Sequence, residues 1–387
     1  MEIRPLDLAD LDAVLDIRSR SFPAMAESDV PGWKAIVEQD AAQFVAGYEG
    51  RRLLSVARYH RFMQYWLGRE VPMAGVAGVA VAPEERGRGV GRMMMAAMLE
   101  RIARDGYPLS ALYPVTTPLY RGLGWELAGP QPSFRIPAES LRTIDAPPVK
   151  LRRAGPEDVS EIREMVRRLH LANRDCGPIL FPEHLWRYWM SAHRPFAYLA
   201  DDGYLEYHWD GRDALVVEFA GALSEQTTRA FWSLVGSSSS VARTVRVNLA
   251  PHDPIWWLTR EIAVEIQPSA QWMLRVVDAP RAVAERGFPV GVSVDVLIAV
   301  DDSQRPSNAG PWQLSVGDGR GSLAPVGPES GGGGDLVRLR AGGFAALYAG
   351  WPMSSLRRAG LAAGGTGGAD TALDAAFAAQ PHCLDYF

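Results

Sequence analysis

The sequence predicts an α/β (α+β) fold in which two α/β units stand in tandem before a smaller α+β unit. Three observations lead to this prediction: a strand-and-helix opening that occurs twice, a glycine-rich loop between a strand and a helix, and a change of composition near residue 289. With 387 residues, of which 47% are hydrophobic, the chain is long enough to bury more than one core. We expect the units to span residues 1–147, 148–286 and 287–387.

The first unit opens with a short strand at residues 2–5 and a helix at 8–17, whose apolar residues recur every three or four positions. The same pattern returns about 148 residues later, with a strand at 149–153 and a helix beginning near 156–162. This repeat favours an internal duplication of one α/β unit. Pro147-Pro148 marks the junction, because neither proline donates a ladder hydrogen bond and both resist helix.

A glycine-rich loop is the clearest functional signal in the first unit. A buried strand is expected at Ala77–Ala82, followed by the loop 86–92 (RGRGVGR) and an amphipathic helix over Val90–Arg104. Such a loop leaves unpaired backbone N–H groups and a positive helix end at one point, and its arginines add fixed charge. We therefore expect an anion site, most naturally for a phosphate. The second unit has a comparable strand at 215–219 and helix at 224–234 without this loop, so we expect it to have lost the site.

The third unit reads as a small sheet of hairpins covered by short helices. Alternating apolar residues predict strands at 292–296 and 312–316, and a third strand follows Gly331–Gly334 at 336–339. Short helices are expected at 344–348, 353–359 and 371–379. Strands followed by helices are typical of an α+β arrangement.

Composition excludes several classes of protein. A formal net charge of −5 gives no broad basic surface for nucleic acid. The longest apolar stretches, near Gly75–Pro83 and Val292–Val300, are too short to span a membrane. Cys176 and Cys383 form no metal or disulfide pattern, and the histidines show no metal spacing. We expect a cytoplasmic protein without a metal.

Arg86-x-x-Gly89-x-Gly91 after a valine-rich strand resembles the acetyl-CoA pyrophosphate loop of the GNAT superfamily of N-acetyltransferases. The segment 119–125 (LYRGLGW) resembles the GNAT motif in which a tyrosine follows a strand. Segments 271–283 and 343–350 and the aromatic end 381–387 resemble the Eis (enhanced intracellular survival) branch. The resemblance implies a GNAT domain, a GNAT-like domain without a coenzyme site, a sterol-carrier-like C-terminal domain, and a homo-oligomer, by family resemblance a hexamer.

The resemblance also implies the coenzyme site and the catalytic acid. The backbone N–H of Val79 would bind the thioester oxygen, and Tyr120 would protonate the departing thiolate. Tyr113 is the alternative acid if the motif is shifted, and a core aromatic residue is the other interpretation of Tyr120. Acetyl-CoA would be held by Val79, Ala80, Val81, Arg86, Gly87, Arg88, Gly89, Val90, Gly91 and Arg92.

In the Eis branch the terminal carboxylate acts as base, which here is that of Phe387. An α-carboxyl has an ordinary pKa of about 3.3 to 3.7, so alone it is a poor base for an ammonium group. We expect it to anchor the cation as well as to accept its proton. The alternative is a frayed terminus, but the aromatic rings of Tyr386 and Phe387 favour burial.

Candidate contacts for the acceptor are Glu27, Asp29, Trp33 and Asp385, because carboxylates pair with ammonium groups and an indole stacks on a cation. Each has a competing interpretation as a solvated loop charge or a core ring. The expected acceptor is a primary amine of an aminoglycoside, a polyamine, a lysine side chain or a cationic natural product. Two alternatives stay open: transfer of a longer acyl group, and a lipid- or partner-binding protein that keeps the GNAT module as a sensor.

Overall fold

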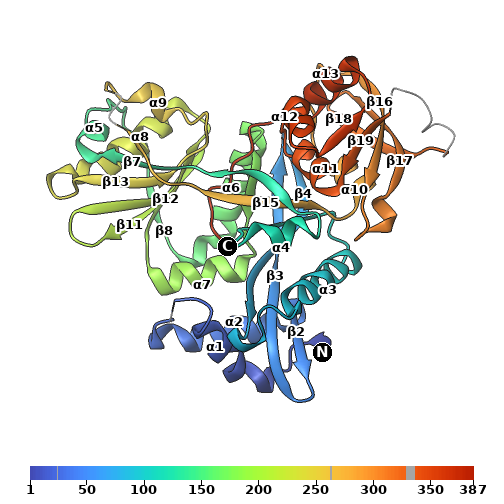
Figure 1. The fold of residues 1–387 in the computed structure, drawn as a ribbon. Helices are drawn as coiled ribbons and strands as arrows, with labels where there is room; N and C mark the ends of the chain where they lie inside the picture. The colour runs from blue at the N-terminus through green and yellow to red at the C-terminus, as the bar shows by residue number, and fades with distance from the viewer. Residues whose placement is uncertain (24, 262–263, 328–335) are drawn as a thin grey trace.

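The computed structural model describes residues 1–387 except 24, 262–263 and 328–335. Figure 1 shows three units, and the C-terminus lies in the middle, where they meet. Each unit is built on one β-sheet. The mixed α/β architecture is the predicted one, and none of the helices in the described parts of the chain is long and apolar enough to cross a membrane.

The first sheet has the order β1-β2-β3-β4-β5-β15-β6, with β9 paired to β3. Its neighbours are antiparallel except for β4 and β5, which run parallel. The strands are β1 (Glu2–Pro5), β2 (Phe44–Glu49), β3 (Arg52–Trp66), β4 (Arg69–Val81), β5 (Leu109–Leu112), β6 (Glu126–Gln131), β9 (Cys176–Leu180) and β15 (Ala270–Val276).

Helices cover both faces of this sheet. The helix α3 (Val90–Arg104) buries Met94, Met98 and Ile102 against one face, which confirms the predicted helix and its apolar side. The helices α1 (Leu11–Ser19) and α2 (Val30–Gln39) cover part of the other face through a separate apolar cluster. The short helices of this unit are η1 (Leu8–Asp10), η2 (Glu27–Asp29), η3 (Ala41–Gln43), η4 (Pro83–Glu85) and α4 (Thr117–Arg121).

The second sheet has the order β14-β7-β13-β12-β11-β10-β8. Its strands are β7 (Ser133–Pro137), β8 (Arg152–Ala154), β10 (Phe196–Ala200), β11 (Gly203–Asp210), β12 (Ala214–Ala222), β13 (Thr244–Asn248) and β14 (Glu265–Ile266). Its helices are α5 (Ala138–Arg142), η5 (Pro156–Asp158), α6 (Val159–Asn173), α7 (Glu183–His193), α8 (Glu225–Gly236), η6 (Ser237–Ser240) and α9 (Ile255–Leu258). Both units therefore open with a strand, a 3-10 turn and a helix, as the duplication predicts.

The first two sheets exchange strands. The strand β7 precedes residue 147 but lies in the second sheet, whereas β9 and β15 follow it and lie in the first. A boundary at 147/148 therefore does not separate the strands of the first sheet from those of the second. The predicted domain limits remain predictions. The exchange locks the two units together, because neither sheet is complete without chain from the other.

The third sheet has the order β18-β17-β16-β19-β20. Its strands are β16 (Val294–Asp301), β17 (Gly310–Gly317), β18 (Arg320–Pro325), β19 (Val337–Arg340) and β20 (Ala362–Gly364). Because β16 and β19 are parallel, the expectation of hairpins alone is wrong. The glycines Gly331–Gly334 lie outside the described residues. The helices are α10 (Ala279–Glu285), η7 (Pro306–Asn308), α11 (Ala341–Tyr348), α12 (Met353–Arg358) and α13 (Gly367–Ala376).

Candidate active site

The first sheet opens into a fork where β4 and β5 separate. The two strands pair only at Met73–Gly75 and Leu109–Ala111. Beyond Gly75, β4 continues to Val81 with β3 on one side and no second partner among the described strands. We call this point the first fork. A strand edge of this kind offers unpaired N–H and C=O groups to an extended ligand.

The free edge makes Ala77–Ala82 less buried than the sequence predicted. Gly78 is exposed and Val79 is half-buried, because β5 has already turned away. The strand register shifts between Val56 and Arg58, and Gly78 takes a φ of +60° that favours glycine. A bulge re-aims the backbone next to it. Val79 therefore stands where its amide could serve a ligand lying along the edge.

The predicted anion loop follows directly. After the short helix η4 (Pro83–Glu85), Gly87 and Gly89 have φ values of +79° and +78°, and Gly89 caps α3 without any side-chain hydrogen bond. A Cβ at either glycine would meet nothing within 4 Å, so glycine is needed for the backbone conformation and not for space. The first amides of α3 have no acceptor within the helix. They and the positive helix end form an anion cradle at the tip of β4.

Three exposed arginines surround this cradle, and each is held through its guanidinium group. Glu85, which is buried, pairs with Arg88 and with Arg52. The other tethers join Arg86 Nε to the Val81 carbonyl at 3.4 Å, Arg86 Nη2 to Ser21 Oγ at 3.2 Å, and Arg92 Nη2 to the Gly122 carbonyl at 3.4 Å. The cradle therefore combines backbone donors with guanidinium charge, which fits a pyrophosphate.

The two candidate tyrosines have different roles. Tyr120, in α4, is 6% exposed, and its hydroxyl has no hydrogen-bond partner within the described residues. Burial, with a smaller effect of Tyr386, raises its pKa to about 12, so the phenol stays protonated. Tyr113 instead donates to the Asp385 carbonyl at 2.7 Å and stacks on Tyr386 at 4.4 Å between ring centroids. Tyr113 thus anchors the C-terminal tail, and Tyr120 is left free to donate.

The C-terminal tail, residues 381–387, is bonded to both of the first two sheets. His382 N–H donates to the Cys176 carbonyl at 2.9 Å, and Cys383 N–H donates to the Pro130 carbonyl at 3.1 Å. The Leu384 carbonyl accepts from Gln131 at 3.1 Å and from Asn248, on β13, at 2.8 Å. The tail is anchored, so the alternative of a frayed terminus is wrong.

The terminal residue lies over the first fork. The Phe387 ring packs edge-on against Phe62 at 5.1 Å and Tyr113 at 5.4 Å between centroids. A Cβ at Gly75, the last residue of β4 that pairs with β5, would stand 2.9 Å from the Phe387 ring and 2.4 Å from Phe62. Glycine at 75 therefore lets the tail approach the sheet. Tyr386 is 64% exposed, so the expectation that both terminal rings are buried is wrong for Tyr386.

Carboxylates of the second unit face the tail. Burial, with smaller effects of the Glu218 and Glu206 charges, raises the pKa of Asp385 to about 7. Tyr204 donates to Glu206, whose pKa is also raised by burial. Asp385 was a sequence candidate, but Glu206 and Glu218 were missed because nothing local marks them. Together they make the surroundings of the tail acidic.

The remaining candidates lie at η2 and α2. Glu27 and Asp29 are exposed, and neither forms a hydrogen bond or ion pair with the described tail. Trp33 is half-buried and packs against the core under α1 and α2, as the core-ring interpretation has it. Gly32 lies against Tyr188 of α7, where a Cβ would stand 2.3 Å from the hydroxyl. The helix α2 therefore touches the second unit, while contacts of Glu27, Asp29 and Trp33 with an acceptor remain predictions.

The second unit contains the same fork in a closed form. β12 and β13 pair in parallel at Ala214–Val217, and β12 then continues to Ala222. The helix α8 follows, but Ser224 caps it by accepting from the Thr227 amide, and the Thr227 hydroxyl donates to Asp202 at 2.6 Å. A carboxylate thus stands where the first fork has its anion cradle. This arrangement supports the expected loss of the coenzyme site.

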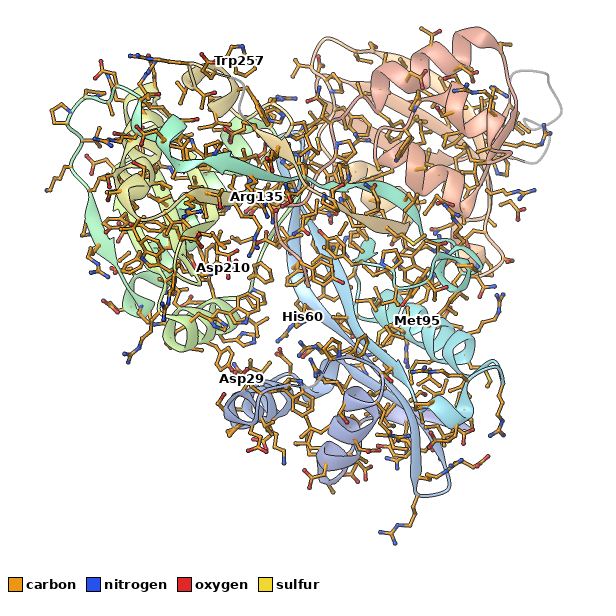
Figure 2. The ribbon with its side chains drawn as sticks, turned by 60° about the vertical axis from the view of Figure 1, so that its left-hand side comes forward. Asp29, His60, Met95, Arg135, Asp210 and Trp257 are labelled. Atoms are coloured by element: carbon orange, nitrogen blue, oxygen red, sulfur yellow. The ribbon has the colours of Figure 1, made fainter. Side chains whose placement is uncertain are left out.

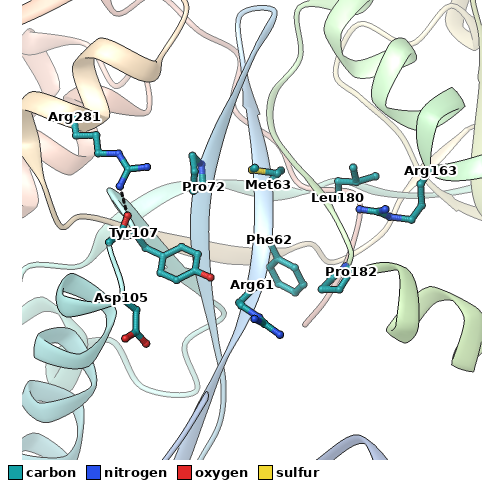
Figure 3. A pocket seen from close by; sticks show the side chains of 11 residues that line it. Arg61, Phe62, Met63, Pro72, Asp105, Tyr107, Arg163, Leu180, Pro182 and Arg281 are labelled. Carbon is teal, nitrogen blue, oxygen red and sulfur yellow. Dashed lines mark hydrogen bonds between the residues drawn. The ribbon is translucent and has the colours of Figure 1, made fainter. Parts of the chain in front are cut away.

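A separate hollow of about 380 Å³ lies around β3 and β4, with lining side chains on both sides of this strand pair (Figure 3). Its Arg281 donates to the Gly106 carbonyl and its Arg163 to the Phe181 carbonyl. Phe62 reaches this hollow from β3 and also contacts Phe387.

Among the described residues, no cluster of three or more histidine, cysteine or acidic side chains could hold a metal ion. Cys176 and Cys383 are free and buried.

Comparison with protein families identifies the class. Models described as acetyltransferase (GNAT) domains match residues 2–128 and 177–276, and a sterol carrier protein domain model matches residues 279–384. The fold and the two matches therefore define a GNAT N-acetyltransferase.

Similarities to individual proteins show which members of this class the chain resembles. The crystal structure of a GCN5-related N-acetyltransferase from Kribbella flavida is 42% identical with a TM-score of 0.94, over 100% of this chain and 98% of that one. The N-acetyltransferase Eis of Mycobacterium tuberculosis is 29% identical over 76% of this chain and 77% of its own length. Eis1 from Mycobacterium abscessus shares the fold, with a TM-score of 0.79, 21% identity and full coverage of both chains. The chain belongs to the GCN5-related N-acetyltransferases, within their Eis-like branch.

Proposed function

We propose that this enzyme transfers the acetyl group of acetyl-CoA to a primary amine of a cationic small molecule. The observation that carries the proposal is the anchored C-terminal residue, which lies over the first fork beside a free strand edge. The proposal joins three features that lie far apart in the sequence: the edge of β4, the hydroxyl of Tyr120 and the carboxylate of Phe387.

The residues at the first fork fit acetyl-CoA. The edge at Val79, Ala80 and Val81 would pair with the extended arm of the coenzyme, and the cradle at the start of α3 would hold its pyrophosphate. The cradle comprises Arg86, Gly87, Arg88, Gly89, Val90, Gly91 and Arg92. Bound there, the coenzyme supplies a thioester with an electrophilic carbonyl. Because both the loop glycines and the free edge of β4 fit acetyl-CoA, they support this ligand over an unrelated anion.

The chain's own groups would then share the work of acetyl transfer. The Val79 amide, at the bulge, would hold the developing oxyanion. Tyr120, protonated and without a partner in the described chain, would donate its proton to the leaving sulfur. The carboxylate of Phe387 would hold the ammonium group and take part in its deprotonation.

The acidic surroundings of the tail support a cationic acceptor. Asp385, Glu206 and Glu218 would pair with additional ammonium groups. Glu27, Asp29 and Trp33 would contact outer parts of such a molecule. An aminoglycoside, a polyamine, a lysine side chain and an amine-bearing natural product all meet this description.

We also propose that the enzyme is a cytoplasmic homo-oligomer, a hexamer by family resemblance. Two large apolar side chains of the second unit support association, since Trp257 is 76% exposed and Ile266 is 82% exposed. Light scattering of the purified protein tests this, and a monomer at micromolar concentration would contradict it. The free buried cysteines Cys176 and Cys383 are consistent with a reducing compartment.

Thiol release from acetyl-CoA with a panel of amines tests the proposed function. The panel contains kanamycin, spermidine and Nα-acetyl-lysine methyl ester, whose side-chain amine is free. Each reaction is checked by mass spectrometry for acetylated product. We expect faster thiol release with at least one polycationic amine than with the lysine ester. Thiol release without any acetylated amine would contradict the proposal.

A further inference from the structure

The strand β3 supplies the floor on which the tail rests. Its residues alternate between the two faces of the sheet. Tyr59 packs into the apolar cluster under α3, so Arg58, His60 and Phe62 project from the opposite face. This is the face that Phe387 covers, because Phe62 contacts its ring. A histidine thus lies between an arginine and an aromatic residue on the acceptor side of the sheet.

His60 is placed close to the end of the chain. It pairs directly across the strands with Gly75, over which the Phe387 ring lies. The His60 ring stacks on Phe62 with centroids 5.3 Å apart and planes 15° apart, and Phe62 in turn meets Phe387. Figure 2 shows His60 on the strand between the helical segment that carries Asp29 and the second unit. The imidazole is therefore one ring away from the terminal residue.

The polar atoms of His60 are unused. The side chain is 7% exposed and makes no hydrogen bond within the described residues. Its ring nitrogens are absent from the set of buried atoms that are sealed from solvent without a partner. They therefore reach open space, where a small molecule could meet them.

Charged groups from each neighbouring element face this imidazole. Arg58 lies on the same strand and His184 on α7, and the ring of Phe387 lies beyond Phe62 on the tail. Asp40, just after α2, accepts from His184 at 3.3 Å. His184 also lines a hollow of about 650 Å³ between the end of α2 and α7. Burial, then Arg58 and then His184, holds the pKa of His60 well below its usual value, so the ring is neutral at pH 7.

We propose that His60 accepts the proton that the substrate ammonium group loses before its nitrogen attacks the thioester. The N–H bond of the ammonium breaks, the proton binds the free ring nitrogen of His60, and the released lone pair becomes the nucleophile. The proton then passes to solvent, directly or through the Phe387 carboxylate. In this division the carboxylate holds the cation and the neutral imidazole relays its proton. Because the lowered pKa makes this imidazole a weak base, the proton does not stay on the ring. The inference rests on the proposed function.

The test compares an amine that must lose a proton with a nucleophile that is already neutral. The first is 1,6-diaminohexane and the second is adipic dihydrazide, which has two terminal nitrogens and is uncharged at pH 7. The variant His60→Gln keeps a polar side chain without a basic nitrogen. His193→Gln, an exposed change on α7, is the control.

We expect His60→Gln to lower kcat/KM for the diamine about 100-fold at pH 7, in the range that proton transfer groups contribute. The loss for the dihydrazide should stay within about threefold, and the loss for the diamine should shrink as the pH approaches the amine's own pKa. Equal losses for both nucleophiles, or no loss for the diamine, would overturn the role of His60.

A second measurement separates this inference from the proposed function. If the wild-type enzyme acetylates neither nucleophile, the proposed function is what fails. The imidazole of His60 is then followed by NMR titration of the unmodified enzyme against the His60→Gln variant. A ring that is already protonated at pH 7 would overturn the inference independently, and a neutral ring at pH 7 supports it.

Discussion

The two forks of this enzyme have the same strand geometry and opposite chemistry. At the first, β4 leaves β5 after Gly75 and ends in a glycine loop whose amides at the start of α3 are open. At the second, β12 leaves β13 after Val217, but Ser224 and Asp202 occupy the start of α8. The fork is therefore a property of the fold, whereas the coenzyme site depends on a few residues at one helix end.

The short helices that follow the two forks differ in the same way. The helix α4 follows β5 and presents Tyr120, while α9 follows β13 and presents Trp256 and Trp257. We expect Tyr120→Phe to lower kcat about 100-fold or more with little change in KM for acetyl-CoA, because the sulfur loses its proton donor. Steady-state kinetics with a saturating amine measures this.

Trp209→Phe is the control for this change, since Trp209 is an exposed aromatic residue on β11 of the second unit. It should leave kcat within about twofold. A Tyr120→Phe enzyme that keeps more than a third of the wild-type kcat would remove this residue as the acid and end the contrast between the two helices.

The arginines should matter only at the first fork. Arg86→Ala should raise KM for acetyl-CoA about 10-fold, the value of one charge-assisted hydrogen bond to a phosphate, with kcat nearly unchanged. Arg229→Ala on α8 removes a half-buried arginine that pairs with Glu225, and it should have no effect on KM. If both substitutions weaken coenzyme binding equally, the second fork has kept a site.

The helix caps should respond differently at the two forks. Gly89→Ala forces a side chain into a φ of +78°, which costs about 1 kcal/mol and displaces the amides, so KM for acetyl-CoA should rise several-fold. Ser224→Ala removes the cap of α8 and should lower the free energy of unfolding by about 1 kcal/mol without affecting KM. Denaturant titration measures the free energy of unfolding of both variants, and steady-state kinetics measures their KM for acetyl-CoA. A normal KM in Gly89→Ala would count against the cradle.

The C-terminal tail lies between the two forks, and we expect low pH to destabilise its packing. His382 is fully buried, and burial lowers its pKa to about 4. Since the folded pKa lies below the ordinary 6.5, the contribution of His382 to stability is complete above pH 6.5 and falls as the pH drops toward 4, by about 3 kcal/mol in total. His252, whose pKa Asp175 raises, offsets part of this loss. Unfolding curves at pH 7.5 and 5 should differ less for His382→Asn than for the wild type.

Local sequence was enough to predict the glycine-rich loop and the helix α3 at the first fork. The glycines at 87 and 89 and the apolar spacing of α3 act over a few residues, so a short window contains the information. The same window could not show that β5 leaves β4 after Gly75, which is why Ala77–Ala82 was expected to be buried. Burial of a strand depends on a partner that the local pattern does not specify.

Long-range features of the site were beyond the sequence. The exchange of β7 and β15 between sheets, and the approach of Glu206 and Glu218 to the tail, depend on pairings across many residues. The resemblance to the Eis branch singled out Phe387, but not His60, which belongs to no motif. His60 and Phe62 are two residues apart on β3 and therefore lie on the same face of the strand. The importance of this face is visible only in the structure, where the C-terminal tail packs on it.

The most direct test of the central claim moves the terminal carboxylate while keeping the ring. A variant that carries one extra glycine after Phe387 retains the aromatic side chain but displaces the charge, whereas Phe387→Leu keeps a carboxylate at the same position in the chain. Thiol release with the best amine of the panel should fall about 100-fold or more in the extended enzyme and only a few-fold in Phe387→Leu. An extended enzyme with activity within threefold of the wild type would contradict a catalytic role for the end of the chain.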